Sequence, residues 1–141
     1  MDDLIKTLKI HEGTNPFVYI DTNGFSTIGT GRCVDKRCEH GLSQDEIDYL
    51  LTNDIKHFIQ ELSIQPFYIG HDSVRQEVLV ELVFNMGLEG LEKFKRFLNA
   101  FALKNYSIAA TELKDSLWAK QVHAQRVNNI CYRIINGKYP L

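Results

Sequence analysis

Residues 12–31 of the chain, EGTNPFVYIDTNGFSTIGTG, decide its fold. Residues 17–20 and 25–28 are rich in the β-branched and aromatic side chains that favour strands. Asn23-Gly24, between these two runs, is a strong signal for a tight turn because both residues tolerate a positive φ. The stretch therefore predicts an antiparallel hairpin, followed by a loop or a further short strand within residues 32–42.

Helical periodicity flanks the hairpin on both sides. Residues 3–11 predict a short amphipathic helix with Asp2 or Asp3 as its N-cap. Ser43 and Glu46 have the form of a capping box, which predicts the start of a long helix. Further helices are expected at about residues 73–86, 91–103, 107–119 with Ser107 as N-cap, and 123–135. Gly87 is expected to stop the first of these helices and Gly137 the last. Strands in one small region and helices elsewhere predict an α+β fold.

The chain has 141 residues, of which 44 % are apolar and 24 % charged, as in an ordinary globular protein. This length fits one globular unit or two small lobes that share a core. The formal net charge is −2, so the basic excess of a nucleic-acid-binding protein is missing and nucleic acid is not an expected partner. Residues 71–141 carry 10 basic and 7 acidic residues, against 6 and 11 in residues 1–70. The basic half suits an anionic polymer such as a cell wall, unless the two halves are simply solvated faces of different charge.

Localisation signals are few. No run approaches the roughly 18 consecutive apolar residues of a membrane span, so no stable membrane insertion is expected. Residues 1–4 are acidic where a signal peptide would be basic, which predicts synthesis in the cytoplasm. His57 and His71 have no partner evident in the sequence and are expected at the surface.

The three cysteines form an odd set, which fits a reducing compartment and argues against a disulfide framework. Cys33, Cys38 and His40 lie close together in the sequence, as zinc ligands do. A structural zinc site needs four ligands, and no convincing fourth is nearby, so no metal is expected. A Cys33–Cys38 disulfide formed after export and two free thiols in a loop both remain open. Cys131 is expected in the core.

Two carboxylates and a hydroxyl are the candidate catalytic groups. Glu12 ends the first helix, Asp21 ends the first strand, and Thr27 lies across the turn, where it can be a cross-strand neighbour of Asp21. Cleavage of a glycosidic bond needs one protonated carboxyl for the leaving oxygen and one ionised carboxylate for water or the cationic sugar. Single acidic residues near turns are more often caps or surface charges, so this pattern alone is a weak signal.

The spacing of these residues resembles that of the phage-type lysozymes, in which Glu-Gly ends the first helix and an Asp-x-x-Gly-x-x-Thr-Ile-Gly-x-Gly hairpin follows. The matching residues are Glu12, Gly13, Asp21, Gly24, Thr27, Ile28, Gly29 and Gly31. The resemblance extends over nearly the whole chain and implies a single lysozyme-like α+β domain, residues 1–141, with an active-site cleft between two lobes. The implied parts are a small β lobe at about 13–43, a connecting helix at about 44–62, and a helical lobe at about 63–141 together with helix 3–11.

The resemblance also implies a reaction. The implied substrate is the β-1,4 bond between N-acetylmuramic acid and N-acetylglucosamine in peptidoglycan glycan strands, cleaved by a monomer without a cofactor. Glu12 matches the general acid, Asp21 the second carboxylate, and Thr27 the hydroxyl beside the attacking water, as in an inverting enzyme. The residues that match substrate contacts are Gly31, Arg32, Phe84 and Asn85.

Two departures from the family pattern concern the general acid. His123 falls where the family has an arginine that pairs with this acid, and Glu81 falls where a neutral polar or small residue is expected, so both are candidate modulators. The resemblance implies a phage or prophage endolysin, which is made in the host cytoplasm and reaches the wall through a holin-type lesion. A catalytically weakened peptidoglycan-binding module is the alternative, and a helical scaffold protein is a third hypothesis.

Overall fold

The computed structural model describes residues 1–39 and 41–141. The chain divides into two compact units, residues 1–50 and 51–141, which we call the sheet unit and the helical unit. The predicted α+β class is confirmed, since a small antiparallel sheet accompanies a mostly helical chain. Among the described residues, no helix combines the length and the apolarity of a membrane span.

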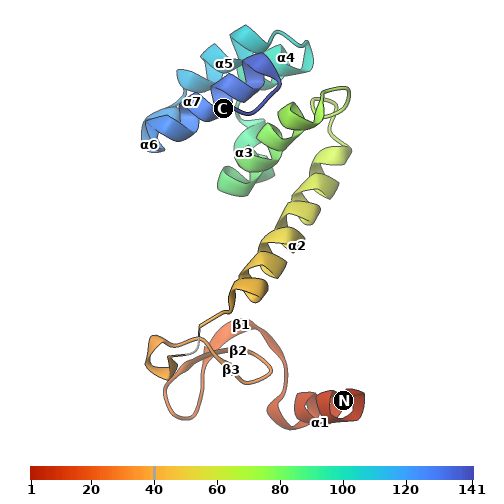
Figure 1. Cartoon of the computed structure of the whole chain (residues 1–141), viewed down its shortest axis with the longest axis vertical. Helices are drawn as coiled ribbons and strands as arrows, with labels where there is room; N and C mark the ends of the chain where they lie inside the picture. The colour runs from red at the N-terminus through yellow and green to blue at the C-terminus, as the bar shows by residue number, and fades with distance from the viewer. Residues whose placement is uncertain (40) are drawn as a thin grey trace. The chain divides into compact units, whose positions relative to one another are not determined.

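The sheet unit is built on three antiparallel strands in the order β1-β2-β3 (Figure 1). β1 (Asn15–Ile20) and β2 (Ser26–Gly29) form the predicted hairpin, and β3 (Arg32–Cys33) is the further short strand. Ile20 pairs with Ser26 across the turn, and an irregularity follows between Asn15 and Tyr19. A 3-10 turn, η1 (Lys36–Cys38), continues the chain after β3.

Helix α1 (Asp2–Glu12) precedes the sheet and extends one residue beyond the predicted range of 3–11 at each end. The prediction that Asp2 or Asp3 caps it is wrong, because Met1 is the N-cap and both aspartates lie inside the first turn. Carboxylates there still favour the helix through its dipole. α1 falls within the sheet unit, so its predicted association with the helical lobe stays a prediction.

Helix α2 (Gln44–Ser63) begins with the predicted capping box. The Ser43 amide donates to Glu46 Oε2 over 2.8 Å, and the Glu46 amide donates to Ser43 Oγ over 3.4 Å. These reciprocal bonds satisfy two of the amide groups that the first helical turn leaves without partners. α2 contributes residues to both units.

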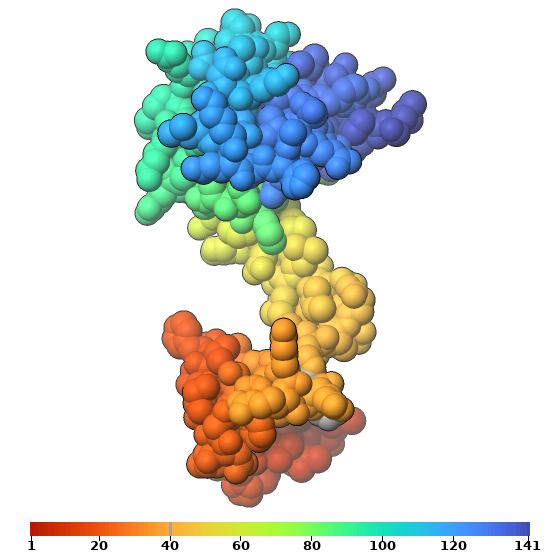
Figure 2. Space-filling model, turned by 90° about the vertical axis from the view of Figure 1, so that its left-hand side faces the viewer, coloured from red at the N-terminus to blue at the C-terminus, as the bar shows by residue number. Residues whose placement is uncertain are grey.

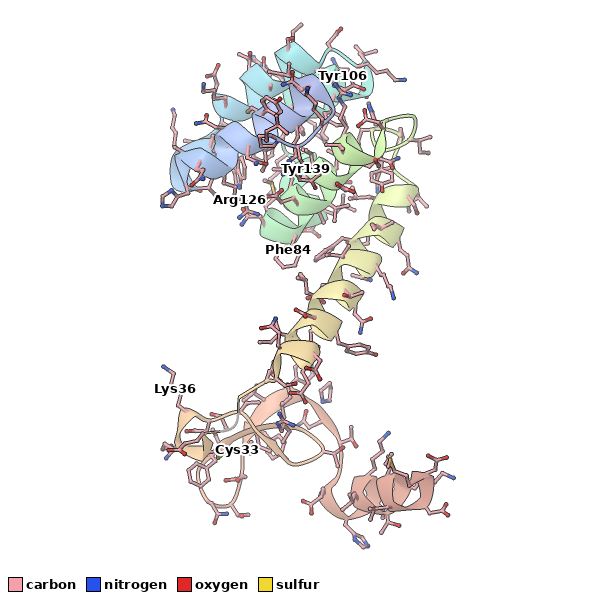
Figure 3. All side chains as sticks on the ribbon, in the orientation of Figure 1. Cys33, Lys36, Phe84, Tyr106, Arg126 and Tyr139 are labelled. Atoms are coloured by element: carbon pink, nitrogen blue, oxygen red, sulfur yellow. A yellow bond between two sulfur atoms is a disulfide. The ribbon has the colours of Figure 1, made fainter. Side chains whose placement is uncertain are left out.

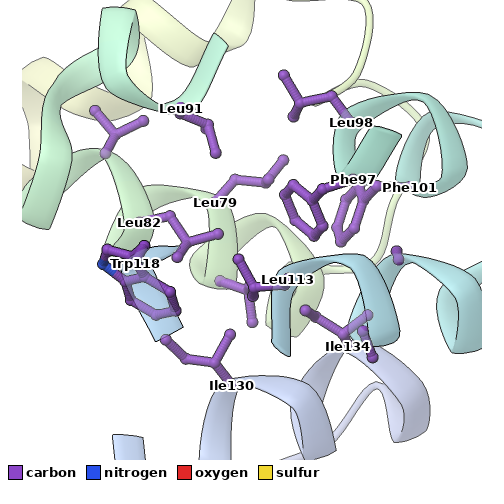
Figure 4. Packing of buried hydrophobic residues seen from close by; sticks show 14 of the residues in the cluster. Leu79, Leu82, Leu91, Phe97, Leu98, Phe101, Leu113, Trp118, Ile130 and Ile134 are labelled. Carbon is purple, nitrogen blue, oxygen red and sulfur yellow. The ribbon is translucent and has the colours of Figure 1, made fainter. Parts of the chain in front are cut away.

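The helical unit contains the remaining helices, which form a closely packed body in the space-filling view (Figure 2). They are α3 (Ser73–Glu92), α4 (Lys95–Ala102), α5 (Tyr106–Lys114), α6 (Leu117–Gln121) and α7 (Ala124–Asn136). Their core is fully apolar at its centre, where Leu79, Leu82, Phe97, Phe101 and Ile130 are at most 1 % exposed (Figure 4).

At the two predicted glycine stops, one helix is interrupted and the other ends. Gly87 has φ 74° and ψ 164° and interrupts α3, although a further turn follows it to Glu92. Gly137 ends α7 in the left-handed conformation, with its amide bonded to the Arg133 carbonyl. Both positions need the positive φ that glycine adopts without steric cost.

The prediction of one continuous helix over 107–119 is wrong, because the structure has two helices, α5 and α6, in this region. Ser116 starts a new helix, α6, because its Oγ accepts from the Ala119 amide over 3.2 Å and donates to the Leu113 carbonyl over 2.6 Å. The N-cap of α5 is Asn105 rather than Ser107. A serine that bonds to neighbouring backbone competes with the helix, which explains the break.

The predicted surface position of His71 is also wrong, since this residue is only 9 % exposed. Its Nδ1 lies 2.9 Å from the Tyr106 hydroxyl, and its ring centroid lies 4.5 Å from that of Phe101. Burial, and secondarily the charge of Lys104, lowers the pKa of His71 below its ordinary value of 6.5. The folded protein therefore holds this ring neutral to a lower pH than the unfolded chain does.

This burial predicts a loss of stability in acid. His71 contributes fully to stability above pH 6.5, and the contribution falls as the pH drops from 6.5 towards the lowered folded pKa, because the unfolded chain takes up the proton first. The variant His71→Gln should show a smaller decrease in the free energy of unfolding between about pH 7 and about pH 5. Urea unfolding, monitored by the fluorescence of the single tryptophan, Trp118, measures this free energy at each pH. His11 is exposed, so His11→Gln is the control. An equal decrease in the free energy of unfolding in the wild type and in His71→Gln would contradict this account.

Candidate active site

Glu12 is the last residue of α1, and Gly13 turns the chain with φ 71° directly after it. The Glu12 carboxyl lies beside the β2–β3 turn, where a Cβ added at Gly31 would be 3.4 Å from Glu12 Oε2. Glu12 also lines a small hollow of about 240 Å³ with Ile5, Leu8, Lys9 and Thr30. The structure thus brings together two predicted site residues, Glu12 and Gly31.

Asp21 follows β1 and organises the hairpin turn. Its Oδ1 accepts from the amides of Asn23 over 2.9 Å and Phe25 over 2.8 Å. Its own amide donates to the Phe25 carbonyl, and its carbonyl accepts from the Gly24 amide. Within the part of the chain that the structure describes, Oδ2 has no protein donor, so this oxygen is available to a water molecule or a sugar hydroxyl.

Thr27 is the buried member of the set, at 3 % exposed. Its cross-strand partner in β1 is Tyr19, whereas Asp21 lies opposite Phe25. Asp21 and Thr27, predicted as cross-strand neighbours, are therefore diagonal neighbours. Phe25 links the two residues, because its amide donates to Asp21 Oδ1 and its carbonyl accepts from Thr27 Oγ1 over 3.2 Å. The hairpin therefore positions both side chains through one backbone unit.

Arg32, the next predicted substrate contact, has an acidic partner in the sheet unit. Its guanidinium donates to Glu46 Oε2 and to the Gly41 carbonyl, each over 2.9 Å. Both side chains of the ion pair are about two-fifths exposed, so this pair contributes little to stability. It does connect β3 with the capping box of α2, and a substrate contact by Arg32 stays a prediction.

Phe84 and Asn85 belong to the helical unit, on α3 before its glycine interruption. Phe84 is 47 % exposed and packs edge-on against Phe58 of α2. Asn85 Oδ1 accepts from Trp118 Nε1 over 2.7 Å, which fixes the orientation of this side chain. An exposed aromatic ring next to an oriented amide is suited to sugar binding, but their contact with a glycan stays a prediction.

Glu81 has two arginine partners that the sequence analysis missed. Its carboxylate accepts from Arg126 Nε over 3.1 Å and from a terminal nitrogen of Arg133, whose side chain is 4 % exposed. The two arginines are seven residues apart on α7 and therefore share one face of that helix, which is the signal that could have found them. Glu81 thus has a structural explanation inside the helical unit.

His123 is the exposed N-cap of α7, with no side-chain capping bond. Its carbonyl accepts from the amides of Arg126 and Val127, which is an ordinary helix start. The proposed effect of His123 and Glu81 on Glu12 concerns residues of the other unit, so it stays a prediction.

Cys33 and Cys38 form a disulfide that closes the loop between β3 and η1. Of the two alternatives left open by the sequence, the structure therefore has the bonded pair. Cys131 is a free, half-buried thiol near the Ala110 carbonyl, and burial raises its pKa. His40, the third residue of the zinc-like pattern, lies outside the described residues, and the described ones contain no group of three or more potential metal ligands.

A mostly helical chain with a small antiparallel sheet is consistent with an α+β lysozyme-like fold. The family model of phage lysozyme matches residues 9–133, and the chain belongs to this family. Members of the family are glycoside hydrolases that act on peptidoglycan.

The chain is similar to two proteins of Dictyostelium discoideum and to part of a longer phage protein. The chain is 26 % identical to probable T4-type lysozyme 1 of Dictyostelium discoideum, over 92 % of each chain. It is 29 % identical to probable T4-type lysozyme 2 of the same organism, over 81 % of this chain and 83 % of the relative. It is 24 % identical to the pre-baseplate central spike protein Gp5 of Enterobacteria phage T4, over 95 % of this chain but only 28 % of the spike protein.

The contact between Gly31 and Glu12 predicts the effect of a small substitution. Gly31→Ala forces alanine to φ 69°, which costs about 1–2 kcal/mol, and places a methyl group against the Glu12 carboxyl. Gly29→Ala imposes a similar φ of 66° with no atom within 4 Å and is the matched control. We expect activity on cell walls to be several-fold lower in Gly31→Ala than in Gly29→Ala. Equal activities of the two variants would show that Glu12 does not depend on this contact.

Proposed function

We propose that the chain hydrolyses the β-1,4 bond between N-acetylmuramic acid and N-acetylglucosamine, with Glu12 as general acid and Asp21 as the second catalytic carboxylate. The observation that carries the proposal is the fixed carboxylate of Asp21, which two backbone amides hold by one oxygen while the other oxygen is left for the reaction. Family membership supports the substrate class.

The proposed mechanism gives the two carboxyls different roles. Glu12, beside the hollow lined by Ile5 and Leu8, donates its proton to the leaving glycosidic oxygen. Asp21 is held at Oδ1 by two backbone amides, and its Oδ2 accepts a proton from the attacking water. One group thus acts as acid and the other as base in the same step.

Thr27 supports an inverting route in this proposal. Its hydroxyl donates to the Phe25 carbonyl, so the lone pairs of Oγ1 can accept a hydrogen bond from a water molecule. Such a water, held between Thr27 and Asp21, attacks the sugar from the face opposite the leaving group. The product is then an anomer inverted relative to the substrate.

In the cell, we propose the role of a phage or prophage endolysin that acts as a monomer. It is made in the host cytoplasm and reaches peptidoglycan through a holin-type lesion of the inner membrane. The Cys33–Cys38 disulfide is compatible with this route, because the wall lies in an oxidising space where such a bond persists. The alternative, a binding module without catalysis, has little support, since Glu81 is explained by its arginine partners.

Replacement of the general acid tests the assignment directly. Glu12→Gln keeps the shape of the side chain but removes its acidic proton, so we expect lysis of purified cell walls to fall at least about a hundredfold. The turbidity of a wall suspension measures it, with exposed Glu89→Gln as a control of matched chemistry. Near-normal lysis by Glu12→Gln would exclude this role, and wall binding without lysis by the wild type would favour the binding module.

The stereochemistry of the product tests the role of Asp21 and Thr27. An inverting enzyme that cleaves a β-1,4 bond releases the new reducing end as the α anomer. We expect proton NMR of a soluble peptidoglycan fragment to show the α anomer first, before mutarotation mixes the two forms. If the β anomer forms first, the reaction is retaining and Asp21 is a nucleophile instead.

A further inference from the structure

The loop that the Cys33–Cys38 disulfide closes contains an ion pair that contacts the hairpin turn. Arg37 donates from Nε to Asp35 Oδ1 and from a terminal nitrogen to Asp35 Oδ2, each over 2.8 Å. The same terminal nitrogen donates to the Gly24 carbonyl over 2.6 Å. The guanidinium therefore bridges the disulfide loop and the turn, which are separate in sequence.

Arg37 also covers the next residue of that turn. Its guanidinium carbon lies 4.6 Å from the centroid of the Phe25 ring, within the range of a cation–π contact. Phe25 is the residue whose amide donates to Asp21 Oδ1 and whose carbonyl accepts from Thr27. Arg37 thus contacts the Phe25 ring and the Gly24 carbonyl, and this carbonyl belongs to the same planar peptide unit as the Phe25 amide that donates to Asp21 Oδ1.

Asp35 anchors the other end of this arrangement. Its side chain, 13 % exposed, accepts from the Ser26 amide over 3.2 Å and from the Arg37 amide. The Arg37 guanidinium, followed by these amides, holds the pKa of Asp35 well below its usual range. Val34 adds a bond from its amide to the Ser26 carbonyl, so the loop is attached to the start of β2 as well as to the turn.

We propose that Arg37 is a positioning residue for Asp21 and that the Cys33–Cys38 disulfide holds Arg37 in place. The inference rests on the proposed catalytic role of Asp21. The ends of the loop, Cys33 and Cys38, are joined covalently, so Asp35 and Arg37 have few alternative conformations in which they leave the turn. Loss of the Arg37 guanidinium or of the disulfide frees the Gly24 carbonyl and the Phe25 ring. The amides that orient Asp21 then lose their fixed direction.

The planar guanidinium is essential to this arrangement. It donates in one plane to Asp35 while it faces the Phe25 ring, and a lysine ammonium cannot reproduce both contacts. Arg37 is 61 % exposed in its side chain, so its charge alone is screened by water. The proposed role of Arg37 therefore depends on the geometry of its contacts more than on its charge. The variant Arg37→Lys, which keeps the charge, separates these two contributions.

The first experiment compares Arg37→Ala and Arg37→Lys with Lys36→Ala. Lys36 lies in the same 3-10 turn and its side chain extends away from the sheet, so its removal changes the net charge equally without touching the turn (Figure 3). On a soluble peptidoglycan fragment, both Arg37 variants should lower kcat about tenfold to a hundredfold and leave KM nearly unchanged, because Arg37 positions Asp21 and does not bind substrate. Lys36→Ala should match the wild type.

The second experiment tests the disulfide. A dithiol reduces the Cys33–Cys38 bond to two thiols and is itself oxidised to a disulfide, and this treatment should lower kcat of the wild type in the same way. The double variant Cys33→Ser/Cys38→Ser should have the lowered kcat from the start and should not respond to the dithiol. Reoxidation should restore activity only in the wild type.

Amide hydrogen exchange gives a readout that needs no activity. In both Arg37 variants and in the reduced wild type, the Phe25 and Asn23 amides should exchange at least about tenfold faster, while amides of α3 stay protected. Unchanged exchange and unchanged kcat in Arg37→Ala would overturn the inference, as would full rescue by Arg37→Lys. If the wild type does not cleave peptidoglycan, the proposed function fails, yet faster exchange at Phe25 would still establish the positioning of Asp21 by Arg37.

Discussion

The two hydrogen bonds that Asp21 Oδ1 accepts from the Asn23 and Phe25 amides are the interaction on which the sheet unit depends. They close the turn at its tightest point, where Gly24 adopts φ 82°. The turn sets the register in which Ile20 pairs with Ser26, and this register places Thr27 on the buried side of β2. A slip by one residue would move Thr27 to the opposite face of the sheet. The same carboxylate therefore stabilises the hairpin turn and is the proposed catalytic base.

The two units differ in what stabilises them. In the helical unit, a large apolar core supplies most of the stability through the burial of aromatic and aliphatic side chains. Among the described residues of the sheet unit, Thr27 is the one buried side chain, so burial contributes little there. Hydrogen bonds, the Asp35–Arg37 pair and the disulfide must take its place, as is usual for small units without a core. A disulfide that closes a loop this short contributes about 2 kcal/mol by the chain-entropy model.

Local sequence signals predicted the elements that local contacts determine. The capping box of Ser43 and Glu46 and the glycine stop at Gly137 involve residues at most four apart, so the pattern alone was sufficient. The break at Ser116 was missed because a serine can bond to neighbouring backbone both at a cap and inside a helix, and only the structure shows which of the two occurs. His71 was misplaced because its partner, Tyr106, lies 35 positions away. For the candidate site, the motif predicted Glu12, Asp21 and Thr27, whereas Arg37 follows only from contacts across the sheet.

The two units hold their side chains in position in different ways. A core fixes side chains by packing on all sides, but a unit with one buried side chain must fix a carboxylate by directed bonds. Each bond to Asp21 comes from the backbone of a turn, and a turn is only as rigid as the residues that restrain it. Arg37 restrains Gly24 and Phe25 from outside, and the disulfide restrains Arg37. The position of Asp21 therefore depends on the bonds within the hairpin turn and on these restraints from outside it, whereas Phe101 in the helical unit is held by apolar side chains packed around it.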